Sequence, residues 1–499
     1  MNRRKFVQAS VAAAVAGALP IRPGFAKILG ASTIVDADIN ALTGDGAEVT
    51  LARVAVQELG ETIRGNLLLP GHEAYEEARR VLNASIDKHP ALIVQPKGVA
   101  DVKDAVDFAR ESNLLVAVKC GGHNVVGKST CDGGMMIDLS TLRSVRVDPK
   151  AKIATVSGGS WLGDMDHDTM AFGLVTTAGT VSHTGVGGLT LGGGFGRVGR
   201  RFGLALDNLL GVDIITADGQ LLRVNAEENQ DLYWGVRGGG GNFGVVTSFD
   251  FKLHEMDREV VGGTVAFPMS EAKSVLNFFA DYAANAPDEL YLDGGITADP
   301  KQGSMAFLHI CYSGPKNMAS KIVDPIRNAG TPIFDDIKAI DYVALQASGD
   351  VSDPRANGSY MKSGFTSHVT PEVIDAILYG FEEHPQRRMT VVYQHAGGAI
   401  GRVASDATAF AHRHVNHDTL FLMDWPVGID PTEHIKWVRE YWKSVEPHTR
   451  GIYANDIVDI SQQKVHRNYG GNYDRLLGLK NKYDPTNLFR LNANIVPTV

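Results

Sequence analysis

The feature that most constrains this chain is the run GTVSHTGVGGLTLGGGFG at residues 179–196. Seven of the twelve residues from 185 to 196 are glycine. Glycine loses more conformational freedom on folding than any other residue, so such a run is expected only where the backbone needs a positive φ or must approach something closely. Shorter glycine-rich turns occur at residues 119–124 and 237–244. Together the three turns predict one extended ligand whose charged middle is held by backbone N–H groups.

A dinucleotide fingerprint is the rival interpretation of this run. Residues 194–199 match G-x-G-x-x-G, and Asp218 follows Gly199 nineteen residues later. The Rossmann motif needs a strand before the glycines and a helix that begins inside them. Here more glycines precede the match, and residues 200–206 contain another glycine and have no clear apolar face. We therefore interpret this match as accidental.

Size and composition indicate an ordinary globular chain. Its 499 residues, 44% hydrophobic and 21% charged, suffice for two or three domains. The net charge of −9, without blocks of Lys or Arg, argues against binding to nucleic acid or to an anionic membrane. Three cysteines (Cys120, Cys131, Cys311) exclude a disulfide framework, although a Cys120–Cys131 bridge is sterically conceivable. No Cys/His spacing resembles a zinc site.

The first 26 residues have the pattern of a twin-arginine signal peptide. Arg3-Arg4-Lys5 precedes an apolar run at 11–19, and Gly24-Phe25-Ala26 resembles a cleavage site. The apolar run is too short to span a bilayer, so no stable membrane anchor is expected. The pattern predicts a bacterial protein that the twin-arginine export machinery delivers to the periplasm or the medium. The alternative is a frayed N-terminus that merely contains Arg-Arg.

Periodicity divides the rest of the chain into four parts. Residues 27–65 form a lead-in with one helix expected at 49–63. Within residues 66–257, a strand at 91–94, a helix at 100–111 and a strand at 114–118 lead to His123 in a glycine turn, and residues 160–172 suggest a helix capped by Ser160. Glycine clusters are missing from 258–449, where strands alternate with helices. The segment 450–499 is again rich in turns.

The turn Lys119-Cys120-Gly121-Gly122-His123-Asn124 resembles the R-x-G-G-H segment of flavoproteins of the vanillyl-alcohol oxidase class. More closely, the chain resembles the berberine bridge enzyme-like branch, on the evidence of residues 185–196, 231–246, 472–476 and 482–485. The similarity covers roughly residues 66–499. It implies an α+β fold with a two-part FAD-binding domain of the PCMH type (66–257 and 450–499). The substrate domain (258–449) would have an antiparallel sheet flanked by helices.

The resemblance implies FAD as the cofactor. In the family, the residue equivalent to His123 is bonded to the flavin 8α-methyl carbon, and many members add a cysteinyl bond at the position of Val181. Because valine cannot form that bond, a single covalent link through His123 is expected. The other expected cofactor-binding residues are Lys119, Cys120, Gly121, Gly122, Asn124, Gly179, Thr180, Thr184, Gly185, Gly187, Gly188, Gly192, Gly193, Gly194, Gly244, Val246 and Asn455.

The same resemblance suggests catalytic candidates. Tyr453-Ala454-Asn455-Asp456 matches a segment near the family's substrate base, but Asp456 stands where many relatives have tyrosine. Asp456 is a candidate base, or only a structural acceptor, and Tyr453 is expected beside the flavin. Tyr393 and His395 are further candidates, although core packing is an alternative for either. The histidine-rich stretch 412–417 lacks a carboxylate or cysteine to complete a metal site.

The predicted function is that of an FAD-linked oxidase. It would remove a hydride from a small alcohol, sugar, phenolic or amine-type substrate and pass the electrons to O₂, giving H₂O₂. Thr184 occupies a family position that controls access of O₂, and its volume is close to that of the valine typical of oxidases, although it could be an ordinary turn residue. The alternatives are a periplasmic dehydrogenase that uses a quinone or cytochrome, and a flavin-bearing binding protein without turnover.

Overall fold

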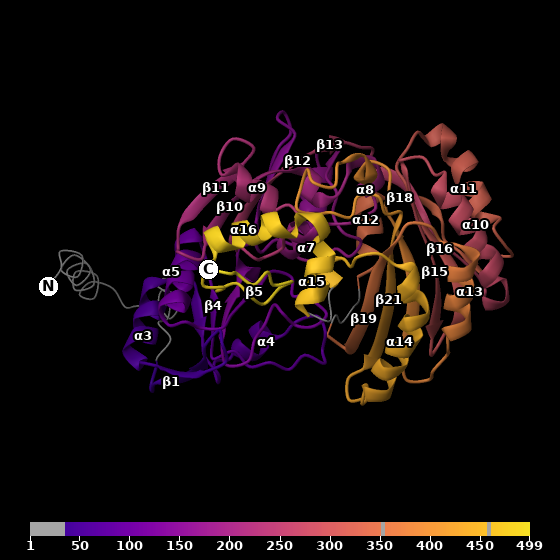
Figure 1. Cartoon of the computed structure of the whole chain (residues 1–499). Helices are drawn as coiled ribbons and strands as arrows, with labels where there is room; N and C mark the ends of the chain where they lie inside the picture. The colour runs from indigo at the N-terminus through magenta and orange to yellow at the C-terminus, as the bar shows by residue number, and fades with distance from the viewer. Residues whose placement is uncertain (1–34, 351–354, 457–460) are drawn as a thin grey trace, which may run out of the picture.

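The computed structural model describes residues 35–350, 355–456 and 461–499 (Figure 1). The predicted signal peptide at 1–26 lies outside the described residues. Two sheet-bearing halves lie side by side, and the C-terminal helices return to the half in which the chain begins. We call residues 35–255 with 461–499 the glycine-rich half, and residues 259–445 the eight-stranded half.

A four-stranded sheet begins the glycine-rich half. Its strand order is β3 (Asn66–Leu68), β4 (Leu92–Gln95), β6 (Met135–Asp138) and β5 (Val116–Lys119). Strands β4 and β5 run parallel to β6, whereas β3 is antiparallel to β4. Helix α5 (Val99–Glu111) lies between β4 and β5 in the chain, and its buried positions follow a helical period. This β-α-β arrangement ends β5 at Lys119, directly before the His123 turn.

The other small elements of this half surround that sheet. A hairpin of β1 (Ile39–Leu42) and β2 (Glu48–Leu51) precedes α3 (Arg53–Thr62), and α4 (Tyr75–Arg79) follows β3. The expected helix at 49–63 therefore begins only at Arg53, because residues 48–51 pair with β1.

A five-stranded antiparallel sheet forms the rest of the glycine-rich half. Its order is β11 (Leu221–Asn225), β10 (Leu209–Thr216), β12 (Gly244–Lys252), β8 (Ile153–Ser157) and β7 (Val145–Asp148). Helices α7 (Val186–Gly192), α8 (Gly199–Phe202) and α9 (Gln230–Gly235) lie among the glycine-rich turns. The C-terminal helices α15 (Gln462–Tyr469) and α16 (Tyr473–Tyr483) belong to the same hydrophobic core.

Helix α6 (Leu162–Met170) starts one residue later than a Ser160 cap predicts, with Trp161 at the N-cap position. The Ser160 hydroxyl instead donates to the Ser144 carbonyl (3.1 Å) and accepts from the Ser144 N–H (3.2 Å). After α6, β9 (Leu174–Val175) pairs with β13 (His254–Glu255). Ser160 therefore joins its own turn to the turn at Ser144 and does not cap the helix.

The eight-stranded half has one antiparallel sheet. Its strand order is β17 (Phe334–Asp335), β14 (Glu259–Pro268), β16 (Gly303–Tyr312), β15 (Leu290–Asp299), β20 (Arg388–His395), β21 (His417–Pro426) and β19 (Asn357–Thr366), and β18 (Lys338–Asp341) also pairs with β14. Helices α10 (Ala272–Ala284), α11 (Ala319–Arg327), α13 (Pro371–Gly380) and α14 (Thr432–Val445) cover its outer face (Figure 1), and α12 (Tyr342–Ala347) contacts α6. The predicted α+β class, with an antiparallel sheet flanked by helices, is confirmed.

Phe279 shows how the outer helices attach to this sheet. It lies in α10, is fully buried, and faces Gly294 of β15. A Cβ atom at Gly294 would lie 2.5 Å from the Phe279 ring, so the ring occupies the space that a side chain would need. The sheet's opposite face is left to the glycine-rich half.

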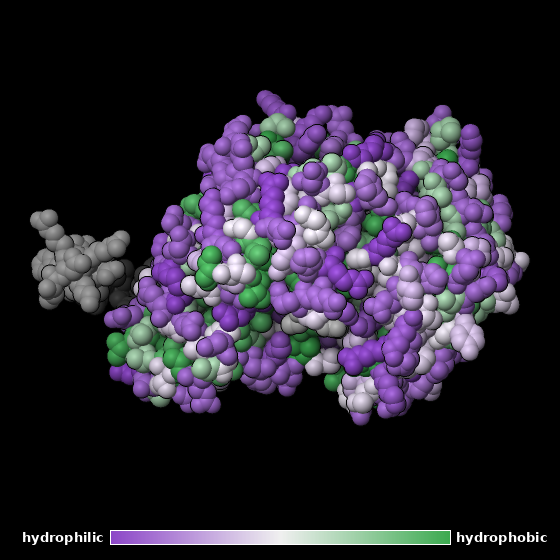
Figure 2. Space-filling view, in the orientation of Figure 1, coloured by the Kyte–Doolittle hydropathy of each residue, from purple (hydrophilic) through white to green (hydrophobic). Residues whose placement is uncertain are grey.

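The surface is mainly hydrophilic on the face drawn in Figure 2, with hydrophobic residues in small groups. Among the described residues, no helix combines the length and apolar character needed to cross a membrane. All three cysteines are free thiols, so the conceivable Cys120–Cys131 bridge is not formed.

Candidate active site

One large cavity, of about 620 Å³, lies between the glycine-rich turns and strands β19, β20 and β21. That volume is within the range of cofactor and ligand pockets. The predicted site residues that line it are Cys120, Gly121, Gly122, His123, Asn124, Gly179, Thr180, Thr184, Gly185, Gly187, Gly188, Gly244, Val246, Tyr453, Asn455 and Asp456. The predicted residues that do not line it are Lys119, Gly192, Gly193, Gly194, Tyr393 and His395.

Lys119 anchors the turn that carries His123. Its buried ammonium donates to the Ala78 carbonyl (2.5 Å) and lies 3.5 Å from the Asp138 carboxylate. Beyond it, Gly121 lies against Gly185 so closely that a Cβ atom would be 2.3 Å from the Gly185 nitrogen. Two backbone segments can approach in this way only without side chains, which explains glycine at both positions.

His123 lies between two residues of the long glycine run. Its Nε2 is 2.7 Å from His183 Nδ1, and its Nδ1 is 3.3 Å from the Thr184 hydroxyl. Burial, with a smaller contribution from His183, lowers the pKa of His123 to about 3. The imidazole is therefore neutral at neutral pH, which is the nucleophilic form of histidine.

Gly192, Gly193 and Gly194 serve the site indirectly. The Gly194 N–H donates to the Tyr453 hydroxyl (2.7 Å), and a Cβ atom at Gly192 would lie 2.2 Å from Asn455 Oδ1. The Asn455 amide also donates to the Tyr453 hydroxyl (2.8 Å). These contacts fix Tyr453 and Asn455 against α7, and burial raises the pKa of Tyr453 well above its usual range.

Tyr393 and His395 point away from the cavity. Both are buried in the sheet's helix-covered side, where Tyr393 stacks on Phe279 and His395 stacks on His417. Side chains alternate along a strand, so the residue between them, Gln394, faces the cavity instead. The structure thus gives both proposed catalytic residues a packing role, the alternative that the sequence left open.

The same alternation brings Arg388 and Asp424 to the cavity, a pair that the sequence analysis missed. Arg388 on β20 lies directly opposite Asp424 on β21, and their side chains form an ion pair of 2.5 Å at the cavity wall. Arg388 could have been predicted, because it is separated from Gln394 by an even number of residues and therefore lies on the same face of β20. The partner Asp424 could not, because the sequence does not reveal how β20 and β21 are aligned.

Asp456 lies at the junction of the cavity with the sheet. Burial raises its pKa to about 7, and the neighbouring Asp418 and Ser363 side chains partly offset that rise. Burial, and then Asp456 itself, raises the pKa of Asp418 well above the usual range. The two carboxyl groups therefore form a buried pair that can take up and release protons near neutral pH.

The C-terminal segment completes the wall on the side of the third glycine turn. The Asn242 amide donates to the Gly239 and Ala493 carbonyls (2.8 and 3.1 Å), and its Oδ1 accepts from the Ile495 N–H (3.0 Å). Lys480, fully buried, pairs with Asp484 at 2.6 Å and also donates to the Asn242 carbonyl (2.9 Å). The turn is thus held from behind by residues at the far end of the chain.

The lining of the cavity fits a large cofactor that lies against the backbone. Gly188, Gly240 and Gly241 line the cavity, and a Cβ atom at any of them would meet no atom within 4 Å. The backbone at these three glycines therefore borders open space that a side chain would otherwise fill. In the described part of the chain, the buried side-chain atoms Ser129 Oγ and Asn492 Oδ1 at this cavity also have no hydrogen-bond partner.

The histidine-rich stretch does not form a metal centre. The His412 ring bonds to the Asn468 carbonyl (2.6 Å), and His417 is buried behind the sheet. Within the three described ranges, no three His, Cys, Asp or Glu side chains come close enough to hold a metal ion.

Comparisons with known proteins agree with this geometry. Residues 90–225 match the model of an FAD binding domain, and residues 455–496 match the model described as berberine and berberine like. An FAD-linked oxidoreductase of Dictyostelium discoideum is 34% identical over 447 residues, which are 89% of this chain and 97% of that protein.

Two further relatives carry names of activities. A xylooligosaccharide oxidase of Thermothelomyces thermophilus is 29% identical, over 80% of this chain and 86% of that protein. The crystal structure of a 6-hydroxy-D-nicotine oxidase of Arthrobacter nicotinovorans superposes with a TM-score of 0.80 at 26% identity, over 87% of this chain and 98% of that chain.

Proposed function

Because the chain belongs to the berberine bridge enzyme-like family of FAD-linked oxidoreductases, we propose that it is an oxidase. It would remove a hydride from a small alcohol, sugar, phenolic or amine-type substrate and pass the electrons to O₂, giving H₂O₂. The observation that carries the proposal is the two-sided cavity. One side is glycine backbone with His123, and the other is polar side chains of β19–β21 with Asp456.

The protein's part in this reaction is binding, orientation and proton transfer. FAD, when bound, accepts the hydride and returns the electrons to an acceptor. The cofactor would lie against the backbone of Gly188, Gly240 and Gly241, and the substrate would lie against Gln394 and the Arg388–Asp424 pair on the opposite wall. These polar groups favour a substrate with hydroxyl or amine groups over a purely apolar one.

Substrate screening is the first test of the oxidase proposal. Sugars, phenols, benzylic alcohols and amines are mixed with the holoenzyme without O₂, and bleaching of the flavin absorbance reports hydride transfer. Air-saturated buffer is then added in a stopped-flow instrument. Fast reoxidation with H₂O₂ formation is expected. Slow reoxidation that a quinone accelerates would identify a dehydrogenase instead, and no bleaching by any compound would contradict turnover.

Asp456 is the proposed base. A carboxylate with a pKa of about 7 is ionised above neutral pH and can take a hydroxyl or ammonium proton there. Asp456→Asn should lower kcat/KM by about 10²–10⁴-fold without loss of bound flavin. Asp424→Asn is the matched comparison, because Asp424 is the ion-paired carboxylate on the same cavity. A larger loss of kcat/KM in Asp424→Asn would assign the proton transfer to Asp424.

We also propose that FAD is attached covalently through His123 alone. The ring is neutral and fixed at both nitrogens, Val181 replaces the family's second attachment residue, and burial raises the pKa of Cys120 to about 11 so that its thiol stays protonated. Denatured wild-type protein should keep flavin fluorescence in a gel. His123→Ala should lose it, whereas the exposed His167→Ala should not. Free FAD released from denatured wild-type protein would contradict the link.

Residues 1–26 are proposed to direct export by the twin-arginine route, on the basis of Arg3 and Arg4. In a bacterial host, wild-type protein should accumulate outside the cytoplasm in a shortened form. The double variant Arg3→Lys, Arg4→Lys should remain inside at full length. Equal distribution of the two proteins between the fractions would contradict the proposal.

A further inference from the structure

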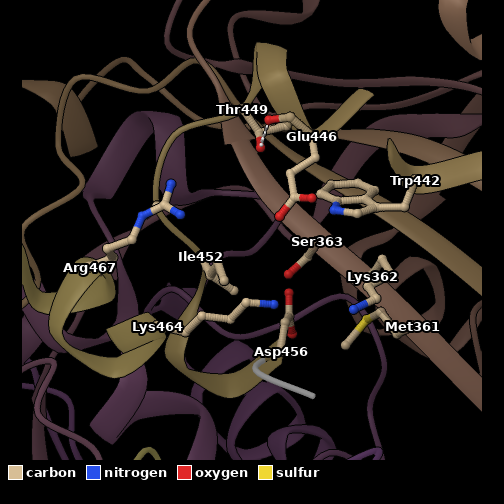
Figure 3. A pocket seen from close by; sticks show the side chains of 11 residues that line it. Met361, Lys362, Ser363, Trp442, Glu446, Thr449, Ile452, Asp456, Lys464 and Arg467 are labelled. Atoms are coloured by element: carbon tan, nitrogen blue, oxygen red, sulfur yellow. Dashed lines mark hydrogen bonds between the residues drawn. The ribbon is translucent and has the colours of Figure 1, made fainter. Parts of the chain in front are cut away.

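Behind Asp456 lies a second, smaller cavity of about 40 Å³. Asp456 and Met361 line both cavities and therefore separate them. Figure 3 shows the side chains of Ser363 and Lys464 converging on Asp456 within the small cavity. Its volume has room for about three water molecules, since one needs roughly 10–15 Å³.

Asp418 is the buried partner of Asp456. It is fully buried on β21, and in the described part of the chain neither of its carboxyl oxygens receives an N–H or O–H donor. The group that it meets is the Asp456 carboxyl. Two carboxyl groups can form a hydrogen bond only when a proton lies between them, so one proton satisfies the otherwise unpaired oxygens.

Polar and charged side chains on the described part of the chain give water a path next to the pair. Besides Asp456 and Ser363, the small cavity is lined by Lys362 on β19, Lys464 and Arg467 on α15, and Glu446. Water in such a cavity can form hydrogen bonds with these polar groups and receive a proton from the pair. On the other side, Tyr453 remains neutral because burial raises its pKa. The small cavity runs from buried Ser363 to exposed Glu446 and Arg467, so it connects the pair with solvent.

We propose that Asp418 and Asp456 share one proton and that Asp456 passes the substrate's proton to solvent through this small cavity. The inference rests on the proposed function, because the proton is taken to come from the substrate of the proposed oxidase reaction. The substrate carbon gives its hydride to FAD, and the O–H or N–H proton goes to ionised Asp456. The pair then holds two protons and returns to one by releasing a proton to water. Asp418 is a positioning residue, because it acts through Asp456.

The shared proton can be observed without any substrate. Infrared spectra of wild-type holoenzyme at pH 9 should contain a protonated-carboxyl band that shifts in D₂O. Asp418→Asn should lack this band, because Asp456 is then the only carboxyl of the pair and is ionised at that pH. Identical bands in both proteins would overturn the shared proton even if no substrate were ever found.

Two variants of Asp418 test its role in catalysis. Asp418→Leu removes the hydrogen bond that lowers the pKa of Asp456, so the acid limb of kcat/KM should move up by about one to two pH units. Asp418→Asn keeps a donor of similar size, so its acid limb should stay near that of the wild type. An unshifted limb in Asp418→Leu, in folded protein with full flavin content, would overturn the positioning role.

The exit route is tested by filling the small cavity from Ile452, which lines it. Ile452→Phe should keep the infrared band but slow its exchange in D₂O and increase the solvent isotope effect on kcat. Ile452→Leu, of unchanged volume, should behave as wild type. Equal exchange rates in the two variants would show that the proton leaves by the large cavity instead.

Discussion

At the scale of single residues, buried charges are the most sensitive positions. Lys480 and Asp484 are both fully buried, and Asp484 also accepts from the Leu488 and Phe489 N–H groups. Lys480→Met would leave this carboxylate without its counter-ion, and breaking a buried pair in this way costs about 3–5 kcal/mol. We expect that loss in the free energy of unfolding, measured by urea denaturation.

Lys482 provides the matched control for Lys480. Lys482 lies two residues after Lys480 and forms an ion pair with Asp231, but both side chains of this pair are exposed. Lys482→Met should therefore cost no more than about 1 kcal/mol. Equal losses for the two variants would show that the Lys480–Asp484 pair contributes no more than a surface pair.

Single residues also show what the sequence alone can identify. His123 was found because its turn has a recognisable order of residues. Asp418 was not singled out, because its partner, Asp456, is distant in sequence and meets it only after the sheet has formed. Arg388 and Asp424 were missed for the same reason, since 36 residues separate them.

At the scale of elements, α10 depends on the glycine beneath it. Gly294→Ala would place a methyl group 2.5 Å from the Phe279 ring, and overpacking of a core typically costs about 1–3 kcal/mol. Phe279→Leu should recover part of that loss in the double variant, because the smaller side chain leaves room for the methyl group. Unfolding free energies of the four proteins measure the coupling, and additive losses would contradict direct contact.

The elements were predictable where one periodicity dominates and not where glycine obscures it. The strand at 91–94 and the helix at 100–111 correspond to β4 and α5 within one or two residues. Helix α7 was hidden in the glycine run, because three of its seven residues are glycine, which is a poor helix former. The helix forms nonetheless, because its close packing against neighbouring segments compensates for the low helix propensity of glycine. A Cβ atom at Gly187 would lie only 3.3 Å from the Gly158 carbonyl oxygen.

At the scale of the whole molecule, buried titratable groups in both halves set the dependence of stability on pH. Burial raises the pKa of Asp166 and Asp293 to about 7 and lowers that of His123 and His309 to about 3. The carboxyls bind more protons in the folded than in the unfolded state between about pH 4 and 7, so their contribution to stability falls as pH rises through that window. The histidines bind fewer protons when folded between about pH 3 and 6.5, so theirs rises.

A substitution of Asp293 tests the contribution of the buried carboxyl groups separately from that of the histidines. It accepts from the Tyr291 hydroxyl and the His395 N–H, at 2.7 and 2.9 Å. Asp293→Asn removes the ionisation but keeps a polar group of the same size. Relative to wild type, the variant should gain unfolding free energy from pH 4 to pH 8, on the order of 4 kcal/mol for a shift of about three pKa units. A difference that does not change with pH would contradict the raised pKa.

The order of strands in the eight-stranded sheet could not be predicted from the sequence. The sequence predicted an antiparallel sheet with flanking helices, but not that β19 would pair with β21 while β20 pairs with both β15 and β21. That order determines which polar positions face the cavity, and therefore which side chains form the proposed substrate wall.

The return of the C-terminal segment to Asn242 has a consequence for how the protein is made. Asn242 and Ile495, joined by a hydrogen bond, are 253 residues apart. At the usual pace of translation, roughly 5–20 residues per second, the third glycine turn leaves the ribosome some tens of seconds before its supports exist. The eight-stranded half, which lies wholly between them, can fold during that interval. The nascent chain must keep the unfinished turn from aggregating until Ile495 has been made, so a cofactor bound at this turn would gain its full support only after that segment is synthesised.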